Sequence, residues 1–311
     1  MKYVYIGLNN AAGDVCYVYN VQVDENTTDL ENLFGGTKIT QLASVGYAQM
    51  EGYLIKTTDG KTVILDGGTT AEATALYNLI KANVTANAEG KYVIDAWFVS
   101  HYHSDHVGAL IEILNTREDI YITSLYYDFS GAQESFDAVE YSYVTGLASA
   151  LSINASKVGS VVTPKKGDEV VVGTVTMKVL NTAYFGSSSN VINNSSIVYK
   201  LETEGESVLF LNDLGDYGDT LLNDSYFEAE MKTCTVVQMA HHGQAGTTDK
   251  FYKAIDDIRV CLYPAPAWLY DVNAGNGIGT GTYGTLGTRE LMRELGVRYS
   301  YSAANGDVVL G

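Results

Sequence analysis

The chain of 311 residues is short of cysteine, proline, histidine and basic side chains, and it has no long apolar run. Its three cysteines, Cys16, Cys234 and Cys261, cannot all pair with one another, and their spacing excludes a zinc ribbon. Cys234 and Cys261 stand in apolar runs, where we expect them to behave as small buried hydrophobic residues. No run approaches the roughly 20 apolar residues of a membrane-spanning helix, so no span is predicted. The first residues, MKYVYIGLNN, show no signal-peptide core.

Basic residues are scarce relative to acidic ones. There are 19 lysines and arginines against 37 aspartates and glutamates, which gives a net charge of −18 without any basic block. Because proteins that bind polyanions normally displace counterions with a basic surface, extended nucleic acid is not an expected partner. A metal site could still supply local positive charge. The composition is compatible with an exported bacterial protein and with a cytoplasmic one, so the compartment and the oligomeric state stay open.

The chain contains short strand-like runs interspersed with helical patterns. No linker or repeat divides it, so we predict one domain over residues 1–311, of the α+β class with sheets covered by helices. The runs that predict strands are 15–23, 52–57, 62–66, 92–100, 169–172, 174–181, 196–203, 207–213, 233–240 and 258–263. The patterns that predict helices are 70–83, 107–115, 132–153, 248–256 and 288–296.

Metal-capable side chains follow four of the predicted buried strands. They are Asp66 after TVILD, His101, His103, Asp105 and His106 after IDAWFVS, Asp213 after SVLFLN, and His241 and His242 after TVVQMA. Ligand sites often lie at the carboxyl ends of strands, where a rigid scaffold holds loop residues. We therefore expect these side chains to form one site.

The spacing within SHYHSDHVGAL has a chemical logic. In an extended segment, residues two apart point the same way, so His101 and His103 can share one ion. Asp105 and His106 follow where the chain turns into a helix beginning near Val107, and they can face a neighbouring position. Imidazole with carboxylate suits zinc, and also manganese or iron. Asp213, from another strand, could bridge two ions, and a pair about 3.5–4 Å apart would activate a shared water.

The hexapeptide HYHSDH resembles the H-x-H-x-D-H signature of the metallo-β-lactamase superfamily. VILDGG is similar to the family's first motif, and FLND is similar to the strand that ends in its bridging aspartate. The order NNSSIVYKLE, SVLFLND, VVQMAHHG most resembles the branch of the competence protein ComEC's nuclease-like domain and the phosphorylcholine esterase of choline-binding proteins. The resemblance implies an αββα four-layer sandwich, a dinuclear metal site at one edge, and hydrolysis, most often of phosphodiesters.

The resemblance also implies roles for individual residues. The implied metal ligands are His101, His103, Asp105, His106, Asp213 and His241, the implied catalytic residues are Asp105, His241 and His242, and the implied supporting residues are Asp66 and Asn181. Asp66 would hold a ligating histidine, although it could instead cap a turn before Gly67 and Gly68. Asp213 competes with Asp216 and Asp219 for the bridging role. His241 and His242 could also be solvated loop residues or a helix-cap pair.

Two histidines that are common in relatives have no counterpart here. None stands between His106 and His241, where Asn181 occupies about the expected place, and TYGTLGTREL contains none. We therefore predict two unequal ions, zinc favoured with manganese or iron possible, one position being completed by water or by an oxygen of Tyr283 or Asn181.

A Gly-rich loop, residues 264–287, is long enough to be functional or disordered. Its Trp268, Tyr270 and Tyr283 either pack against the core or line the substrate site.

The sequence thus predicts a metal-dependent hydrolase that uses a metal-bound hydroxide on a small phosphodiester. The alternatives are a lactonase or other acyl hydrolase, a DNA nuclease of the same fold, and a non-catalytic metal-binding module with an impaired site.

Overall fold

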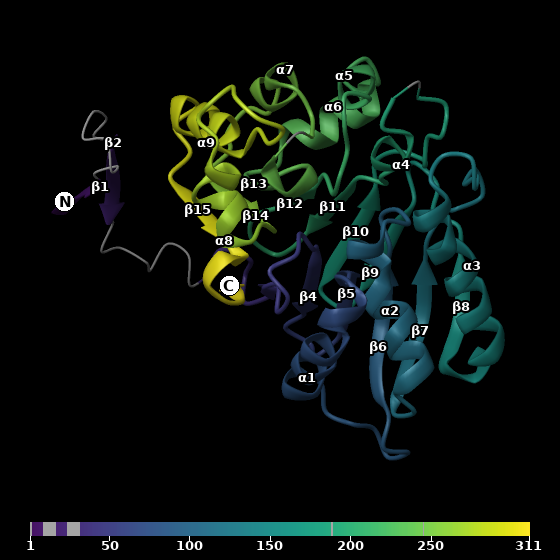
Figure 1. Ribbon diagram of the computed structural model, residues 1–311. Coiled ribbons are helices and arrows are strands. Elements are labelled where there is room, and N and C mark those ends of the chain that lie inside the picture. Colours follow the sequence, from purple (N-terminus) through teal and green to yellow (C-terminus); the bar gives the residue numbers. More distant parts are fainter. Residues whose placement is uncertain (1, 9–16, 24–31, 188, 245) are drawn as a thin grey trace.

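The computed structural model describes residues 2–8, 17–23, 32–187, 189–244 and 246–311. Two seven-stranded sheets lie face to face between two layers of helices (Figure 1). This arrangement confirms the predicted α+β class and the αββα sandwich. No helix among the described residues is long and apolar enough to cross a membrane.

The first sheet is antiparallel at one side and parallel at the other. In spatial order its strands are β16 (Val308–Leu310), β3 (Lys38–Gln41), β4 (Gly52–Lys56), β5 (Thr62–Asp66), β6 (Tyr92–Phe98), β7 (Ile120–Tyr126) and β8 (Val158–Val162). Strands β5 to β8 run parallel, so their carboxyl ends meet at one edge. All five residues of β5 are buried, as expected for a strand covered on both faces.

The second sheet repeats this division. Its strands, in spatial order, are β15 (Tyr299–Ser302), β14 (Val260–Tyr263), β13 (Val236–Gln238), β12 (Val208–Phe210), β11 (Tyr199–Glu202), β10 (Val175–Val179) and β9 (Glu169–Val172). Strands β12 to β15 are parallel and β9 to β12 antiparallel. The parallel strands again place their carboxyl ends together.

Helices cover the outer face of each sheet. The helices over the first sheet are α1 (Ala73–Asn83), α2 (Ser104–Thr116) and α3 (Ala138–Ile153). The helices over the second are α5 (Gly218–Leu221), α6 (Ser225–Lys232), α7 (Asp249–Lys253), α8 (Ala267–Tyr270) and α9 (Thr285–Glu294). Short elements α4 (Val191–Asn194), η2 (Thr70–Glu72), η3 (Ala155–Lys157), η4 (His241–Gly243), η5 (Asn273–Gly275) and η6 (Ala303–Asn305) lie in the connections.

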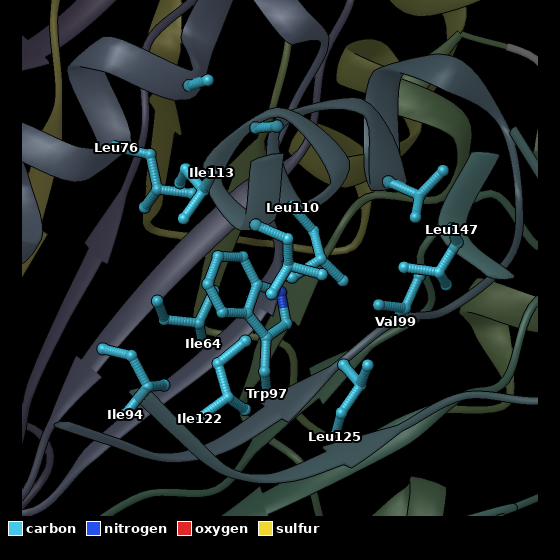
Figure 2. Packing of buried hydrophobic residues seen from close by; sticks show 14 of the residues in the cluster. Ile64, Leu76, Ile94, Trp97, Val99, Leu110, Ile113, Ile122, Leu125 and Leu147 are labelled. Atoms are coloured by element: carbon cyan, nitrogen blue, oxygen red, sulfur yellow. The ribbon is translucent and has the colours of Figure 1, made fainter. Parts of the chain in front are cut away.

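The interior consists of one core between the sheets and one under each helical layer. Figure 2 shows the core under α2, where Trp97 of β6 packs beneath Leu110 and Ile113. The Trp97 indole N–H donates to the Asp66 carbonyl oxygen at 3.0 Å, which ties this core to the end of β5. A side chain at Gly108 would meet the backbone of Thr70 at 2.8 Å, so α2 approaches η2 as closely as it does only because residue 108 is glycine.

Strands β1 (Lys2–Leu8) and β2 (Tyr17–Val23) pair antiparallel in a separate two-stranded sheet, which Figure 1 draws beside the sandwich. The strand expected over 15–23 is confirmed from Tyr17, whereas Val15 and Cys16 lie outside the described residues. The two remaining cysteines are buried in the core under α5 to α9, and neither forms a disulfide. Burial raises the pKa of the Cys234 thiol to about 12.

Several predicted boundaries are wrong. The helix expected over 132–153 begins at Ala138, because the Asp137 carboxylate accepts hydrogen bonds from the first free N–H groups. The helix expected from Val107 begins at Ser104, so Asp105 and His106 stand in its first turn rather than before it. Strand β12 ends at Phe210, three residues before Asp213. Among the described residues, β1, β3, β7, β8, β15 and β16 are strands that the pattern did not predict.

Candidate metal centre

A cleft of about 400 Å³ opens at the edge where the parallel strands of both sheets end. Its lining residues come from both halves of the sandwich: Ala48, Gln49, Thr69, His103, Ser104, Asp105, Glu140, Asp213 and His241. No lysine or arginine is among them. All five histidines of the chain lie in or beside this cleft.

His101 and His103 form the first set of donor atoms. The Nε2 atom of His101 lies 3.0 Å from Nδ1 of His103, so the two rings present nitrogens to one point. The Nδ1 atom of His101 is held by the hydroxyls of Ser100 at 3.0 Å and Ser196 at 3.3 Å. His101 is buried and His103 is half-buried. The pair therefore faces the cleft with one ring fixed from behind.

Asp105, His106 and His242 form a second set. The Nε2 atom of His242 lies 3.1 Å from an Asp105 carboxylate oxygen, and Nε2 of His106 lies 3.9 Å from the other. His242 Nδ1 contacts the Pro264 carbonyl oxygen at 2.9 Å. A carbonyl accepts only, so Nδ1 carries a proton, and Nε2 is the ring nitrogen that could coordinate an ion.

Asp66 supports the second set from behind. One of its carboxylate oxygens accepts from His106 Nδ1 at 2.7 Å and from the Ser100 hydroxyl at 2.7 Å, and the other accepts from the Ser100 N–H at 2.8 Å. These contacts fix the ring and direct its Nε2 toward the cleft. The next glycines form a tight turn, in which Gly68 has a φ of 91°.

Asp213 lies between the two sets. Its carboxylate oxygens are 3.2 Å from His106 Nε2, 3.7 Å from His242 Nε2 and 3.9 Å from His101 Nε2. Asp216, the sequence competitor for this role, accepts instead from the Asn194 amide, and Asp219 accepts from the Thr248 hydroxyl. Asp213 is thus the aspartate of this segment that the fold brings to the histidines.

Several donor atoms of this site are buried without a hydrogen-bond partner among the described residues. They are His106 Nε2, His242 Nε2 and Asp213 Oδ1. Leaving such atoms unpaired is costly, and the geometry gathers them instead of separating them. Nitrogen and carboxylate donors of this kind fit a divalent metal ion, so the residues present match the group that the sequence resemblance implies.

The charges of the metal-free site shift several pKa values. For Asp213, burial raises the pKa of the carboxyl, but His106 and His242 outweigh it and hold the pKa well below its usual range. For His106, burial lowers the pKa, yet the carboxylates of Asp213 and Asp66 raise it well above the usual histidine value. The pKa of His101 is lowered by burial and by the neighbouring His106. The site therefore contains strongly interacting charges of both signs.

His241 stands at the mouth of the cleft. Its side chain is 21% exposed, and its Nε2 lies 3.8 Å from Asp213 and 3.3 Å from the Asn193 amide nitrogen. Asn193 was not among the predicted site residues, although it is buried and adjacent. Asn181, which was, donates to the Ser196 carbonyl and accepts from the Val198 N–H, so its amide is engaged with backbone. It supports the segment that carries Ser196 and not a histidine ring.

Trp268, Tyr270 and Tyr283 are not among the residues that line the cleft. Trp268 packs edge-on against Tyr283 at 5.3 Å and donates to the Tyr47 carbonyl. The Tyr270 ring is covered by the Arg289 guanidinium at 4.1 Å. All three aromatics pack onto the core under α5 to α9, which matches the packing alternative.

Glu51 and Gln238 are further polar residues of the site that the sequence reasoning missed. Both are completely buried, and the Gln238 amide donates to a Glu51 carboxylate oxygen at 2.9 Å across the two sheets. The available signal was a polar residue inside each of two apolar runs, MEGYLI and VVQMA. Their pairing spans 187 positions and cannot be inferred from either run alone.

The backbone is left-handed at four site residues that are not glycine. The φ angles are 52° at Asp66, 51° at Asn212, 50° at His241 and 57° at His242. Asn, Asp and His tolerate this region better than most residues, but it remains uncommon and costs energy. These residues lie at the ends of β5, β12 and β13, where the chain turns at the cleft.

The fold and the site together define a class: an αββα sandwich with histidines and carboxylates gathered where its parallel strands end. The model of the metallo-beta-lactamase superfamily matches residues 52–258, and the chain belongs to that superfamily. Its members are generally hydrolases, and the clustered donors suggest that this chain is a metal-dependent one.

Solved structures share the fold at low identity. The metallo-beta-lactamase fold protein YhfI from Bacillus subtilis is 14% identical with a TM-score of 0.51, over 88% of this chain and 98% of that one. Zn²⁺-bound PqqB from Methylobacterium extorquens is 11% identical with a TM-score of 0.51, over 88% and 99%. A search of curated proteins gives no match.

Proposed function

We propose that the protein is a metal-dependent phosphodiesterase that acts on small substrates. The observation that carries the proposal is the pair of donor sets, His101 with His103 and Asp105 with His106 and His242, on either side of Asp213. Bound divalent ions would activate a water molecule and neutralise charge on the substrate. Two ions are proposed, with zinc first because relative PqqB is Zn²⁺-bound, and with manganese or iron as alternatives.

We assign different roles to the two adjacent histidines. His242 is the proposed metal ligand, since its Nδ1–H is given to the Pro264 carbonyl and its Nε2 is left for coordination. His241, partly exposed at the cleft and held beside Asn193, is the proposed proton donor to the leaving oxygen. Asp105 lines the cleft and would accept a hydrogen bond from the attacking water.

The phosphodiester preference is supported by the resemblance of NNSSIVYKLE and VVQMAHHG to the ComEC and phosphorylcholine esterase branch. The restriction to small substrates is supported by charge. The net charge is −18, and no basic side chain lines the cleft. A long polyanion would meet repulsion there without compensating contacts.

One observation favours a second candidate. A cleft without lysine or arginine suits a neutral acyl substrate as well as a small phosphodiester, so an acyl hydrolase such as a lactonase is the alternative. Turnover of bis-p-nitrophenyl phosphate and of a simple lactone, each with and without EDTA, separates the two. EDTA-sensitive phosphodiester turnover supports the proposal, lactone turnover alone supports the alternative, and activity on neither indicates a non-catalytic module.

Substrate size is tested separately. Turnover of a small phosphodiester is compared with nicking of plasmid DNA at equal ionic strength. Efficient plasmid cleavage would contradict the small-substrate proposal and favour a nuclease.

A further inference from the structure

We propose that Glu51 supplies an additional carboxylate to the metal position formed by Asp105, His106 and His242. The inference rests on the proposed metal centre and adds to it a residue that no sequence motif pointed to. Glu51 lies directly before β4, at the inner floor of the site, and its side chain is completely buried.

The backbone of Glu51 is fixed between two segments that carry site residues. Its N–H donates to the Asp105 carbonyl oxygen at 3.0 Å, and its carbonyl accepts from the Gly67 N–H at 3.1 Å. Asp105 belongs to the second donor set, and Gly67 follows Asp66. The backbone of Glu51 therefore cannot shift without also shifting the segments that carry Asp105 and Asp66.

One carboxylate oxygen of Glu51 is held by Gln238. The Gln238 amide is itself fixed, because its oxygen accepts from the Asn212 N–H and its nitrogen donates one hydrogen to the Met239 carbonyl at 2.8 Å. The Nε2 atom then donates to Glu51 Oε2 at 2.9 Å. A carboxylate pinned through one oxygen presents the other in a defined direction.

The other oxygen, Oε1, is buried and makes no hydrogen bond with any described residue. A Glu51 oxygen lies within 4.8 Å of donor atoms of Asp213 and His242, and also of Asp66 and His106. Among the described residues, no lysine or arginine forms an ion pair with Glu51. A buried carboxyl group is compensated either by a proton or by a cation, and the nearest place for a cation is the second donor set.

A charge count agrees with this assignment. The three buried carboxylates of Glu51, Asp66 and Asp213 and the partly exposed one of Asp105 gather in one region, and two divalent ions would bring four positive charges. Hard oxygen donors also favour harder ions, so Glu51 should raise the affinity for manganese more than that for zinc.

The test is calorimetric addition of Zn²⁺ and of Mn²⁺ to chelator-stripped protein, comparing wild type with Glu51→Gln. We expect one of two ions to bind about 10–100-fold more weakly in the variant, with the larger loss for Mn²⁺, and the other ion to be nearly unaffected. Glu51→Asp, whose carboxylate is one methylene shorter, should weaken the same ion by a smaller factor and serves if Glu51→Gln does not fold.

Glu72→Gln is the matched control. Glu72 is also completely buried, but it caps η2 by accepting from the Thr69 N–H and hydroxyl, away from the histidines. The Glu72→Gln substitution should lower the melting temperature by the same amount with and without metal. Glu51→Gln should instead reduce the rise in melting temperature that metal produces, without lowering that of the metal-free protein.

The outcomes separate this inference from the proposed function. Wild type that binds two ions, together with a Glu51→Gln variant of equal affinities, overturns the role of Glu51 alone. Wild type that binds no ion overturns the metal centre and with it this inference.

Discussion

Two groups of charged residues in this molecule differ in burial and in whether their polar atoms find partners within the chain. The metal-centre cluster consists of Glu51, Asp66, Asp105 and Asp213 with the five histidines. The lysine cluster consists of Lys178 and Lys200 with Glu169, Glu202 and Glu230, on β9, β10, β11 and α6.

In the lysine cluster the charges are paired within the chain. Lys200 contacts Glu230 at 2.7 Å, Glu202 at 3.2 Å and the Thr233 hydroxyl at 2.8 Å, and none of the cluster's five members has a buried atom without a partner. In the metal-centre cluster, His106 Nε2, His242 Nε2, Asp213 Oδ1 and Glu51 Oε1 are buried without a hydrogen-bond partner among the described residues. Buried charge alone therefore does not indicate a functional site, whereas several unpaired imidazole and carboxylate donors gathered at one place do.

Removing metal should have the largest effect, and only on the metal-centre cluster. Exhaustive chelation should abolish hydrolysis and lower the melting temperature. A ligand that binds only the folded state adds about 4 kcal/mol to the free energy of unfolding when its concentration is a thousand times its Kd. Calorimetric add-back should give two separated affinities. Two equally tight zinc ions that survive dialysis would contradict the expected inequality.

Replacing single ligands should come next. His101→Ala and His103→Ala should each remove metal and activity from a protein that still folds, since both rings face one point at the cleft. Elemental analysis measures metal content, a turnover assay measures activity, and circular dichroism measures folding. Full metal content with wild-type turnover in either variant would exclude that histidine as a ligand.

Opening the lysine cluster should change stability without changing metal binding. Lys200→Met leaves Glu230 and Glu202 without their closest cation, and we expect a loss of about 2 kcal/mol in the free energy of unfolding. The double variant Lys200→Met/Glu230→Leu should recover part of that loss, since no unpaired charge of the pair remains. Urea unfolding measures both, and a change in metal affinity would show that the two clusters are coupled.

Acid should give the smallest effect. For Glu230, burial raises the pKa, but Lys200 and Lys178 outweigh it and lower the pKa below its usual value. A lowered pKa in the folded state stabilises the protein above the unfolded value of about 4.3 and is lost as the pH falls through the folded value. The stability difference between metal-free wild type and Glu230→Gln should therefore be constant near pH 7 and shrink below about pH 4. A stability difference that grows as the pH falls would contradict a lowered pKa of Glu230 in the folded protein.

Local patterns predicted the α+β class and the positions of the metal-capable residues at strand ends, whereas the four-layer sandwich came from the family resemblance. TVILD and IDAWFVS are strongly apolar, and the side chains after them could be placed at an edge because parallel strands end together. The limits of α2 and α3 were wrong because caps decided them: the Asp137 carboxylate at α3, and Glu140, which accepts from the Ser104 N–H at the start of α2. The Glu140 contact joins two helices and has no local signature.

The same reason explains what was missed at the site. Glu51 and Gln238 read as isolated polar residues in apolar runs, and only the packing of two sheets brings them together. The proposal that His242 and not His241 is the metal ligand depends on the Pro264 carbonyl, which is 22 positions away. Periodicity reports which face of a strand is buried, and it carries no information about which distant atom completes a hydrogen bond.

The left-handed backbone at Asp66, His241 and His242 sets a direction for laboratory evolution. A residue with a Cβ in this region costs roughly 1–2 kcal/mol relative to glycine. Selection for heat resistance in a chelating medium should therefore enrich glycine at His241, whose side chain is partly exposed, before Asp66 or His242, whose side chains hold buried hydrogen-bond partners. Selection in a metal-rich medium should retain the strained residues, because the bound ions stabilise the fold by more than the strain costs. A single library should thus give heat-stable variants without activity under chelation, and variants that keep the metal ligands and hydrolase activity when metal is supplied.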